Sequence, residues 1–301
     1  MKHLIKKTST FSQACEAYKT SISFSKLKAR TQKDYIYNFT KACNNIGTIK
    51  LKSLKYRDVS DAYDYWMSTF GVRSSNYIAS CVSIVLNHCI KHEAIQHNPM
   101  SLVDKTKTKP RRVMWTFDQV KLFLDTAYSD FKWRSIGLIF HMAYDWAQRV
   151  GDMRKLTWDS VDLDAQRADL TQSKTGVLVK VPINDKLTKM LRTQKEEYDG
   201  LSDYVAPRMK PRAGVYSHYD ENEISRLVNE IKDKVNLPKD LHARDLRRTG
   251  ITEMVEMGVD LAGIMQVSGH QSPQSANPYL VNTFSGASKS LERRYKNGNK
   301  Y

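Results

Sequence analysis

The sequence lacks the features that mark membrane-spanning and secreted proteins. No stretch approaches ~18 consecutive apolar residues, so a transmembrane helix is not expected. The first ten residues, MKHLIKKTST, lack the apolar core of a signal peptide. The four cysteines show no Cys-x-x-Cys spacing, and we expect them to be reduced core residues of a cytoplasmic protein.

Common catalytic signatures are also absent. The sequence has no Gly-x-x-x-x-Gly-Lys phosphate loop, no Gly-x-Ser-x-Gly nucleophile turn and no His-Glu-x-x-His metal pair. His88 and His92 are four residues apart on a predicted helix, but no nearby residue completes a metal site. We therefore expect these two histidines to be surface or packing residues and not metal ligands.

Positive charge is abundant and unevenly distributed. The formal net charge is +16, and residues 1–112 hold 20 lysines and arginines against 7 aspartates and glutamates. That segment carries +13, and residues 113–301 carry only +3. A soluble basic surface is one explanation, but the imbalance favours a domain that binds a polyanion. No basic amphipathic helix with a bulky apolar face is evident, so nucleic acid is favoured over a membrane.

A basic segment divides the chain. Residues 104–113, DKTKTKPRRV, are almost free of apolar side chains and predict an exposed linker. We expect domains at 1–103 and 114–301, with a C-terminal tail from about residue 285. The linker cations are candidate DNA contacts: Lys105, Lys107, Lys109, Arg111 and Arg112.

The first domain has a helical pattern throughout. Apolar residues at helical spacing predict one helix that ends at Gly47 and two more, over residues 58–71 and 74–95. This pattern fits a DNA-binding domain and a purely structural helical bundle equally well. The excess of basic residues favours DNA binding.

The second domain mixes helices with a short hairpin. Thr116 and Gln119 form a capping-box pattern that begins a helix, and residues 133–158 predict a long helical run broken near Gly151. Residues 167–183 contain alternating apolar residues and a Ser-Lys-Thr-Gly turn between two predicted short strands. Val177, Val179 and Val181 lie on one face. The expected fold class is mainly α with a small β-sheet.

Six polar residues stand at unusual places in this second domain. Each is ordinary alone, since a helix-end arginine most often forms a surface ion pair and a tyrosine beside proline most often packs. Their order and spacing together resemble the catalytic domain of the tyrosine recombinases, or phage integrase family, over roughly residues 114–285. The matched residues are Arg149, Lys174, Arg244, Arg247, His270 and Tyr279. The resemblance implies an α+β catalytic domain preceded by a helical core-binding (SAM-like) domain.

The resemblance also implies a chemistry. Arg149 and Arg247 would clamp the two non-bridging oxygens of one scissile phosphate, because guanidinium is planar, permanently charged and bidentate. Tyr279 would attack that phosphate to give a 3′-phosphotyrosine ester, which conserves the bond energy without ATP. Lys174 would protonate the leaving 5′ oxygen, and His270 would contact or orient the phosphate. The family's chemistry needs no metal and no cofactor.

Arg244 is a departure from the family pattern. It occupies the position where histidine is usual. Histidine can accept or donate a proton near neutral pH, whereas arginine can only donate. Arg244 therefore fits a third phosphate donor, and proton removal from Tyr279 would have to come from elsewhere or be dispensable.

The favoured function is a site-specific DNA recombinase, an integrase of a phage or other mobile element. Its implied partners are double-stranded DNA at specific sites, three further copies in a tetramer, and a host DNA-bending or directionality factor; no membrane partner is implied. The implied location is the bacterial cytoplasm or nucleoid. A chromosome-dimer-resolving recombinase, a type IB topoisomerase and a catalytically weakened DNA-binding protein of the same fold are the alternatives. The tail fits either an arm on a neighbouring protomer or a frayed basic end.

Overall fold

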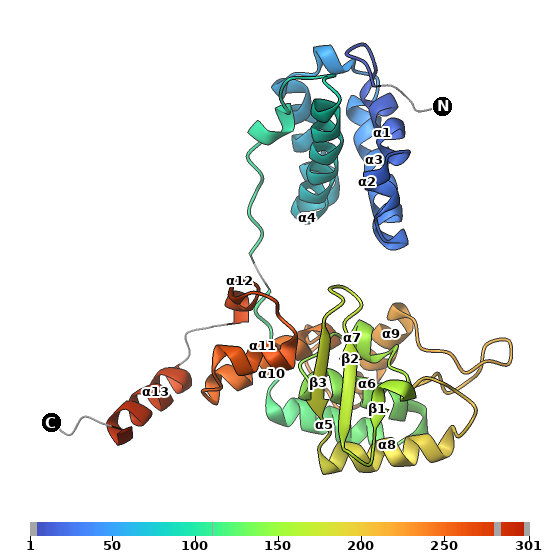
Figure 1. Ribbon diagram of the computed structural model, residues 1–301, viewed down its shortest axis with the longest axis vertical. Helices are drawn as coiled ribbons and strands as arrows, with labels where there is room; N and C mark the ends of the chain where they lie inside the picture. Colours follow the sequence, from blue (N-terminus) through green and yellow to red (C-terminus); the bar gives the residue numbers. More distant parts are fainter. Residues whose placement is uncertain (1–4, 110, 280–283, 298–301) are drawn as a thin grey trace. The chain divides into compact units, whose positions relative to one another are not determined.

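The computed structural model describes residues 5–109, 111–279 and 284–297, and it divides into two compact units (Figure 1). Unit 1 is Met1–Arg111 and unit 2 is Arg112–Tyr301. Each has its own hydrophobic core.

Unit 1 is entirely helical in its described part. Helix α3 ends at the predicted Gly47, and α4 has a break at Gly71 (φ 74°, ψ 167°), between the two helices predicted for this region. Trp66, Ile78 and Leu86 of α4 are fully buried against the other helices. The elements are α1 (Phe11–Lys19), α2 (Ile22–Ser25), α3 (Ala29–Ile46), η1 (Leu51–Ser53), α4 (Tyr56–Lys91) and η2 (Pro99–Leu102).

The chain that leaves unit 1 is held against α4 for its first few residues. The backbone N–H of Thr106 donates to the hydroxyl of Tyr63 (2.9 Å), and Asn76 Nδ2 donates to the carbonyl of Thr106 (2.8 Å). Lys105 Nζ donates to Ser80 Oγ (3.2 Å). Thr106 is the last residue of this anchored segment, and Trp115 is buried in unit 2.

Unit 2 combines helices with one small sheet, which confirms the expected fold class. The three strands are antiparallel in the order β1-β2-β3, and Leu170 pairs with Val179 in the predicted hairpin. The elements are α5 (Phe117–Tyr128), α6 (Phe131–Asp145), α7 (Val150–Met153), η3 (Trp158–Ser160), β1 (Val161–Asp162), β2 (Arg167–Thr171), β3 (Leu178–Pro182), α8 (Asp185–Glu197), α9 (Glu221–Lys234), η4 (Ala243–Asp245), α10 (Leu246–Glu256), α11 (Leu261–Ser268), α12 (Pro273–Ala276), η5 (Asn277–Tyr279) and α13 (Phe284–Asn297).

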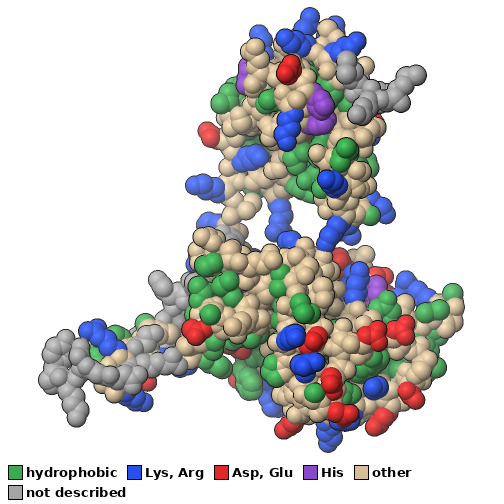
Figure 2. Space-filling view, viewed as in Figure 1, with side chains coloured by type: hydrophobic (Ala, Val, Ile, Leu, Met, Phe, Trp, Pro, Cys, Tyr) green, Lys and Arg blue, Asp and Glu red, His purple; other side chains and the backbone are tan. Residues whose placement is uncertain are grey.

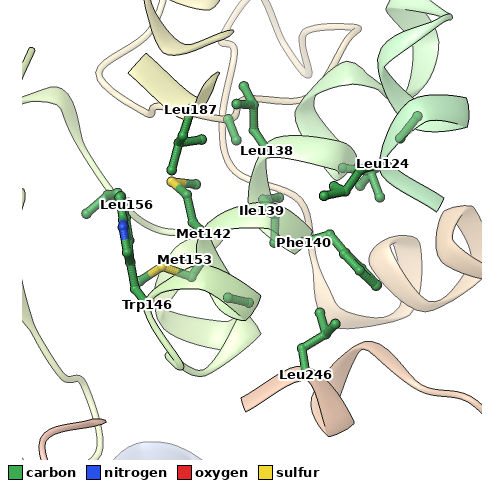
Figure 3. Packing of buried hydrophobic residues seen from close by; sticks show 14 of the residues in the cluster. Leu124, Leu138, Ile139, Phe140, Met142, Trp146, Met153, Leu156, Leu187 and Leu246 are labelled. Carbon is green, nitrogen blue, oxygen red and sulfur yellow. The ribbon is translucent and has the colours of Figure 1, made fainter. Parts of the chain in front are cut away.

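Helix α6 is the centre of unit 2, and residues 135–143 are all buried. A helix that is covered on every side needs apolar residues all round, which explains the sequence Ile136 to Ala143. Phe140 stacks on Phe123 of α5, with ring centroids 3.9 Å apart, and side chains from α8 and α10 pack on the same helix (Figure 3). This packing fixes α10 beside the C-terminal end of α6.

The predicted break near Gly151 was wrong in position. Helix α6 already ends at Asp145, Ala147 adopts a positive φ of 49°, and Arg149 is the N-cap of α7. Gly250 of α10 explains the close packing here, because a Cβ on it would lie 2.6 Å from the carbonyl oxygen of Tyr144. The turn at residues 146–149 therefore depends on α10, which lies about 100 residues away in the sequence.

Charge is distributed over the surface as the sequence indicates. Figure 2 shows basic side chains on the face of unit 1 with few acidic ones among them, whereas acidic and basic groups are mixed on unit 2. None of the described helices is both long and apolar enough to cross a bilayer.

Candidate active site

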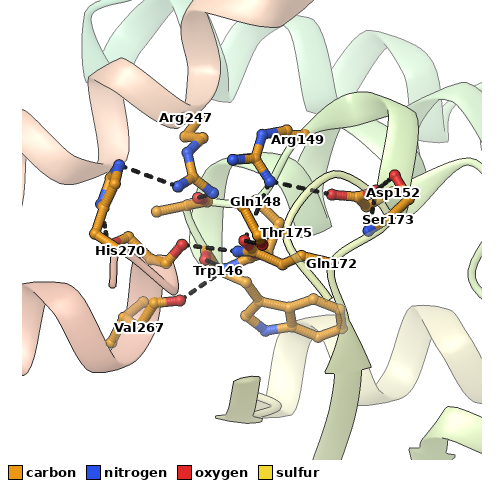
Figure 4. Close-up of polar contacts among 12 residues, drawn as sticks. Trp146, Gln148, Arg149, Asp152, Gln172, Ser173, Thr175, Arg247, Val267 and His270 are labelled. Carbon is orange, nitrogen blue, oxygen red and sulfur yellow. Dashed lines mark hydrogen bonds and ion pairs between the residues drawn. The ribbon is translucent and has the colours of Figure 1, made fainter. Parts of the chain in front are cut away.

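Arg149 and Arg247 lie side by side although 98 positions separate them in the sequence (Figure 4). The turn after α6 presents Arg149, and the first turn of α10 presents Arg247. The helical run predicted over residues 133–158 places Arg149 within a helix, but its backbone is extended (φ −75°, ψ 135°) at the N-cap of α7.

Arg247 is a buried cation without a carboxylate partner. Only 6% of the residue is exposed, and Nη1 donates to the carbonyl of Ala147 (3.1 Å) while Nη2 donates to Nε2 of His270 (3.3 Å). No ion pair joins it to any described residue. Burial, and then the charge of Arg149, lower the pKa of Arg247. Such a site is costly unless an anion completes it.

Arg149 is partly balanced by Asp152. The guanidinium lies 3.7 Å from Asp152 Oδ2, and Nη1 also donates to Gln172 Oε1 (3.1 Å). The other carboxylate oxygen of Asp152 accepts from the backbone N–H (3.1 Å) and the hydroxyl (2.5 Å) of Ser173. Asp152 therefore ties Arg149 to the hairpin that carries Lys174.

Lys174 lies at the exposed turn between β2 and β3. Its ammonium group makes no hydrogen bond or ion pair with any described residue. The turn is anchored on both sides of the lysine, by Ser173 on Asp152 and by Thr175 Oγ1 donating to Gln172 Oε1 (3.0 Å). The base of the turn is thus fixed, and the lysine side chain itself is unpaired.

His270 follows the left-handed Gly269 (φ 71°) that ends α11. Because arginine can only donate, Nε2 of His270 accepts from Arg247, and Nδ1 must carry the proton. Nδ1–H then donates to Ser268 Oγ (2.7 Å), whose own proton goes to the carbonyl of Ile264 (2.6 Å). Burial, with the charges of Arg247 and Arg149, lowers the pKa of His270 to about 4, so the ring is neutral at pH 7.

Tyr279 ends η5 and is half-buried beside these groups. Its ring centroid lies 5.3 Å from that of His270, and the ring packs on the small cluster around Ile251 and Ile264. Arg248 contributes a contact that the sequence analysis missed. Its guanidinium lies 5.2 Å from the centroid of the Tyr279 ring, and Nη1 donates to the carbonyl of Pro278 (3.2 Å).

Arg244 is exposed in η4 and shares a cavity of about 510 Å³ with Arg149 and Arg247. The apolar wall of this cavity includes Ile224 and Val228 of α9. All three arginines therefore border one concave site, and His270 and Tyr279 lie beside Arg247 outside that cavity lining. These positions account for all six sequence-predicted residues; the five linker cations are exposed.

The sequence analysis also missed the residues beneath the site. Gln148, Gln172 and Ser268 are buried and hydrogen-bonded to the segments that carry Arg149, Lys174 and His270. The available signal was position alone, since Gln148 precedes Arg149, Gln172 lies two residues before Lys174, and Ser268 lies two before His270.

Comparison with known proteins extends this description. The chain is 23% identical over 246 residues to the ICEBs1 integrase of Bacillus subtilis (strain 168), a match that covers 74% of this chain and 65% of that protein. The chain thus spans slightly less than two thirds of the length of this curated relative.

Solved structures share the fold. The Tn1549 transposon integrase in complex with a circular intermediate DNA matches with a TM-score of 0.79 at 16% identity, over 95% of this chain and 99% of that one. A lambda integrase tetramer bound to a Holliday junction matches with a TM-score of 0.73 at 17% identity, over 88% of this chain and 79% of that one. The model of the phage integrase family matches residues 114–285, more than half of the sequence and the whole of the constellation above. The chain belongs to the phage integrase family.

Proposed function

We propose that this protein is a site-specific DNA recombinase, an integrase that cuts and rejoins DNA strands through a 3′-phosphotyrosine intermediate. One observation carries the proposal above the others. Arg247 is a buried guanidinium that forms no ion pair with a carboxylate of the described residues, and it lies beside a second arginine and a tyrosine. A phosphodiester supplies the missing negative charge and places phosphorus within reach of a nucleophile.

In the proposed reaction the Tyr279 hydroxyl releases its proton to water, its oxygen forms a bond to phosphorus, and the bond from phosphorus to the 5′ oxygen breaks. Arg149, Arg247 and Arg244 hold the non-bridging oxygens, whose negative charge grows as phosphorus becomes pentavalent. Lys174 gives a proton to the leaving 5′ oxygen, which suits its unpaired position on the hairpin. Rejoining reverses these steps with a 5′ hydroxyl from the partner strand, so energy is conserved in the ester.

The domain roles belong to the same proposal. Unit 1 has an excess of basic residues and binds the duplex. The linker cations contact DNA phosphates: Lys105, Lys107, Lys109, Arg111 and Arg112. The protein works as a tetramer, as the lambda integrase does on its Holliday junction, and the tail that includes α13 reaches a neighbouring protomer. The names of the ICEBs1 and Tn1549 relatives favour a mobile element as the source of its sites. The proposed location is the bacterial cytoplasm or nucleoid.

Covalent capture tests the proposal. The purified protein is incubated with a randomised duplex library that includes DNA flanking its own gene and carries sulfur in place of the 5′-bridging oxygens, so that rejoining fails. Adducts that share one sequence motif are expected, and Tyr279→Phe abolishes them without weakening DNA binding because it removes only the nucleophilic oxygen. Tyr295→Phe, at an exposed tyrosine of α13, is the matched control and keeps the adducts.

Each other result points to an alternative. Adducts without a motif indicate a topoisomerase. Captured DNA that matches a chromosome-dimer resolution site, and not the flanks of the gene, indicates a housekeeping recombinase. Tight binding with no adduct indicates a protein that only holds DNA, with Arg244 in the place of the histidine that could accept a proton. Adducts that survive in Tyr279→Phe shift the nucleophile to Tyr295 or to Tyr301, which lies outside the described residues.

A further inference from the structure

Two glutamine side chains are buried directly beneath the arginine pair. Gln148 and Gln172 are each 1% exposed. Glutamine is usually found at the surface, and a buried amide needs hydrogen-bond partners in the protein. They come from different elements, the turn after α6 and the end of β2. Neither residue contributes to the chemistry described above.

Gln172 uses the whole hydrogen-bonding capacity of its amide. Nε2 donates to Gln148 Oε1 (2.7 Å) and to the carbonyl of Ser268 (2.8 Å). Oε1 accepts from Arg149 Nη1 (3.1 Å) and from Thr175 Oγ1 (3.0 Å). A single side chain thus contacts the first arginine, the lysine hairpin and the end of α11.

Gln148 completes the connection from the other side. Its Nε2 donates to the carbonyls of Trp146 (2.8 Å) and Val267 (2.7 Å), and its Oε1 accepts from Gln172 (Figure 4). Fully satisfied buried networks of this kind are rigid, because every alternative position leaves a polar group unpaired. The two amides therefore join the turn before Arg149, the hairpin of Lys174 and the segment before His270.

The backbone of α11 is fitted to this pair. Gly269 has a φ of 71°, and a Cβ built on it would lie 2.5 Å from Gln172 Nε2 and 2.8 Å from Val179 Cγ2. Only a residue without a side chain lets the end of α11 approach so closely. His270 is the next residue, so the position of its ring depends on this contact.

The neutrality of the amide is also informative. A carboxylate at position 172 would hold Arg149 equally well, but it would neutralise the guanidinium that the phosphate requires. An amide oxygen orients the guanidinium and leaves its charge available. Among the described residues, Asp152 is the carboxylate that pairs with Arg149, and at 3.7 Å that ion pair is long.

We infer that Gln148 and Gln172 are positioning residues that hold Arg149, the Lys174 hairpin and the His270 segment in one fixed arrangement for cleavage. The inference rests on the proposed function for its purpose. Small errors in the placement of such groups cost up to ~100-fold in rate even when they arise away from the reacting atoms.

The kinetic test compares Gln172→Leu with Gln194→Leu. Gln194 of α8 is equally buried and bonds Ser135 Oγ (2.9 Å) away from the site, so its variant measures the general effect of losing a buried amide. With the sulfur-substituted duplex captured by the wild type, Gln172→Leu is expected to form adducts about 10- to 100-fold more slowly at saturating protein. Its DNA affinity stays within about twofold, as does the cleavage rate of Gln194→Leu.

Gln172→Glu and Gln148→Leu guard against a folding defect. Gln172→Glu is nearly isosteric, and we expect it to cleave as slowly as Gln172→Leu because it neutralises Arg149 and repels Gln148 Oε1 and the carbonyl of Ser268. Thermal melting identifies any variant that is unfolded. If a folded Gln172→Leu or Gln172→Glu protein cleaves within about threefold of the wild type, the inference is wrong.

A second measurement needs no DNA and separates this inference from the proposed function. Arginine side-chain ¹⁵N spectra, with Arg149 assigned through Arg149→Lys, report whether its guanidinium rotates freely. Restricted rotation is expected in the wild type and in Gln194→Leu, and averaged signals in Gln172→Leu. A wild type that forms no adducts would overturn the proposed function. An Arg149 signal unchanged by Gln172→Leu would overturn the positioning role.

Discussion

At the scale of single residues, His270 is the group whose state the structure defines most fully. Its two ring nitrogens have different partners, and the chain from Arg247 through the ring to Ser268 and Ile264 permits one tautomer. The neutral ring also adds no third positive charge beside Arg149 and Arg247. His270 therefore acts as a hydrogen-bond acceptor for Arg247.

The lowered pKa of His270 predicts a pH-dependent contribution to stability. The pKa rises from about 4 in the folded protein to 6.5 on unfolding, so the unfolded state binds more protons between those values. The stability that depends on the neutral ring is fully present above pH 6.5 and is lost as pH falls towards 4. The difference in unfolding free energy between the wild type and His270→Asn should shrink over that window, measured by urea titration at each pH.

His97→Asn provides the comparison for this prediction, because His97 is exposed on unit 1. The unfolding free energy of His97→Asn should change with pH in parallel with that of the wild type. If the unfolding free energy of His270→Asn also runs parallel to that of the wild type, the ring of His270 is not held neutral by its surroundings.

The sequence locates the candidate site residues better than the residues that support them. Arg149, Arg247, His270 and Tyr279 were identified by order and spacing, and the structure brings their side chains close together. Lys174, identified in the same way, lies on the hairpin that Asp152 and Gln172 join to Arg149. Gln148 and Gln172 were missed because glutamine is common and usually exposed, so nothing in a single sequence distinguishes a buried amide. Burial is a property of the packed fold, and here it depends on α11 lying against β3 and Gln172.

At the scale of elements, the sequence correctly located the end of a helix or strand when residues close in the sequence form its cap or turn. The capping box of Thr116 and Gln119 begins α5, and the Ser-Lys-Thr-Gly turn joins β2 to β3. The end of α6 could not be found in this way. Residues 146–149 are compatible with helix, and the positive φ of Ala147 is imposed by packing against α10.

Gly269 gives a prediction about the junction of α11 with the hairpin. Gly269→Ala should lower the free energy of unfolding by roughly 2 kcal/mol or more, since it combines a left-handed backbone with a contact on Gln172 and Val179. Gly214→Ala is the control, because Gly214 has a similar φ of 77° with open space around its Cβ position. Denaturant titration measures both, and the difference between them reports the contact alone.

Gly269→Ala should also slow DNA cleavage, because a shift of Gln172 would break its hydrogen bond with Arg149. Equal destabilisation in Gly269→Ala and Gly214→Ala would show that the end of α11 does not press on the hairpin.

At the scale of the whole molecule, the division of charge matches the division into units. Unit 1 and the linker carry most of the net charge of +16, and unit 2 carries the site with nearly balanced charges. Under the proposed function, this arrangement predicts that most of the salt-dependent affinity for DNA comes from the N-terminal third, because each phosphate contact releases condensed counterions.

Replacement of Lys105, Lys107 and Lys109 with glutamine should therefore flatten the salt dependence of DNA binding. The slope of log K against log salt should fall by roughly 0.9 for each phosphate contact that is lost. The matched variant replaces three exposed lysines of α8 with glutamine and changes the net charge equally: Lys186, Lys189 and Lys195. If filter binding gives equal slopes for the two variants, the linker lysines do not contact the DNA phosphates.

The contacts of Thr106 with α4 limit how far apart the two units can engage the same duplex. Nine residue steps separate Thr106 from Trp115, which is buried in unit 2, and an extended chain spans at most ~30 Å over that distance. One turn of B-DNA is ~34 Å long. If the proposed function holds, phosphates contacted by residues at the two ends of this tether would therefore lie within about one turn of each other.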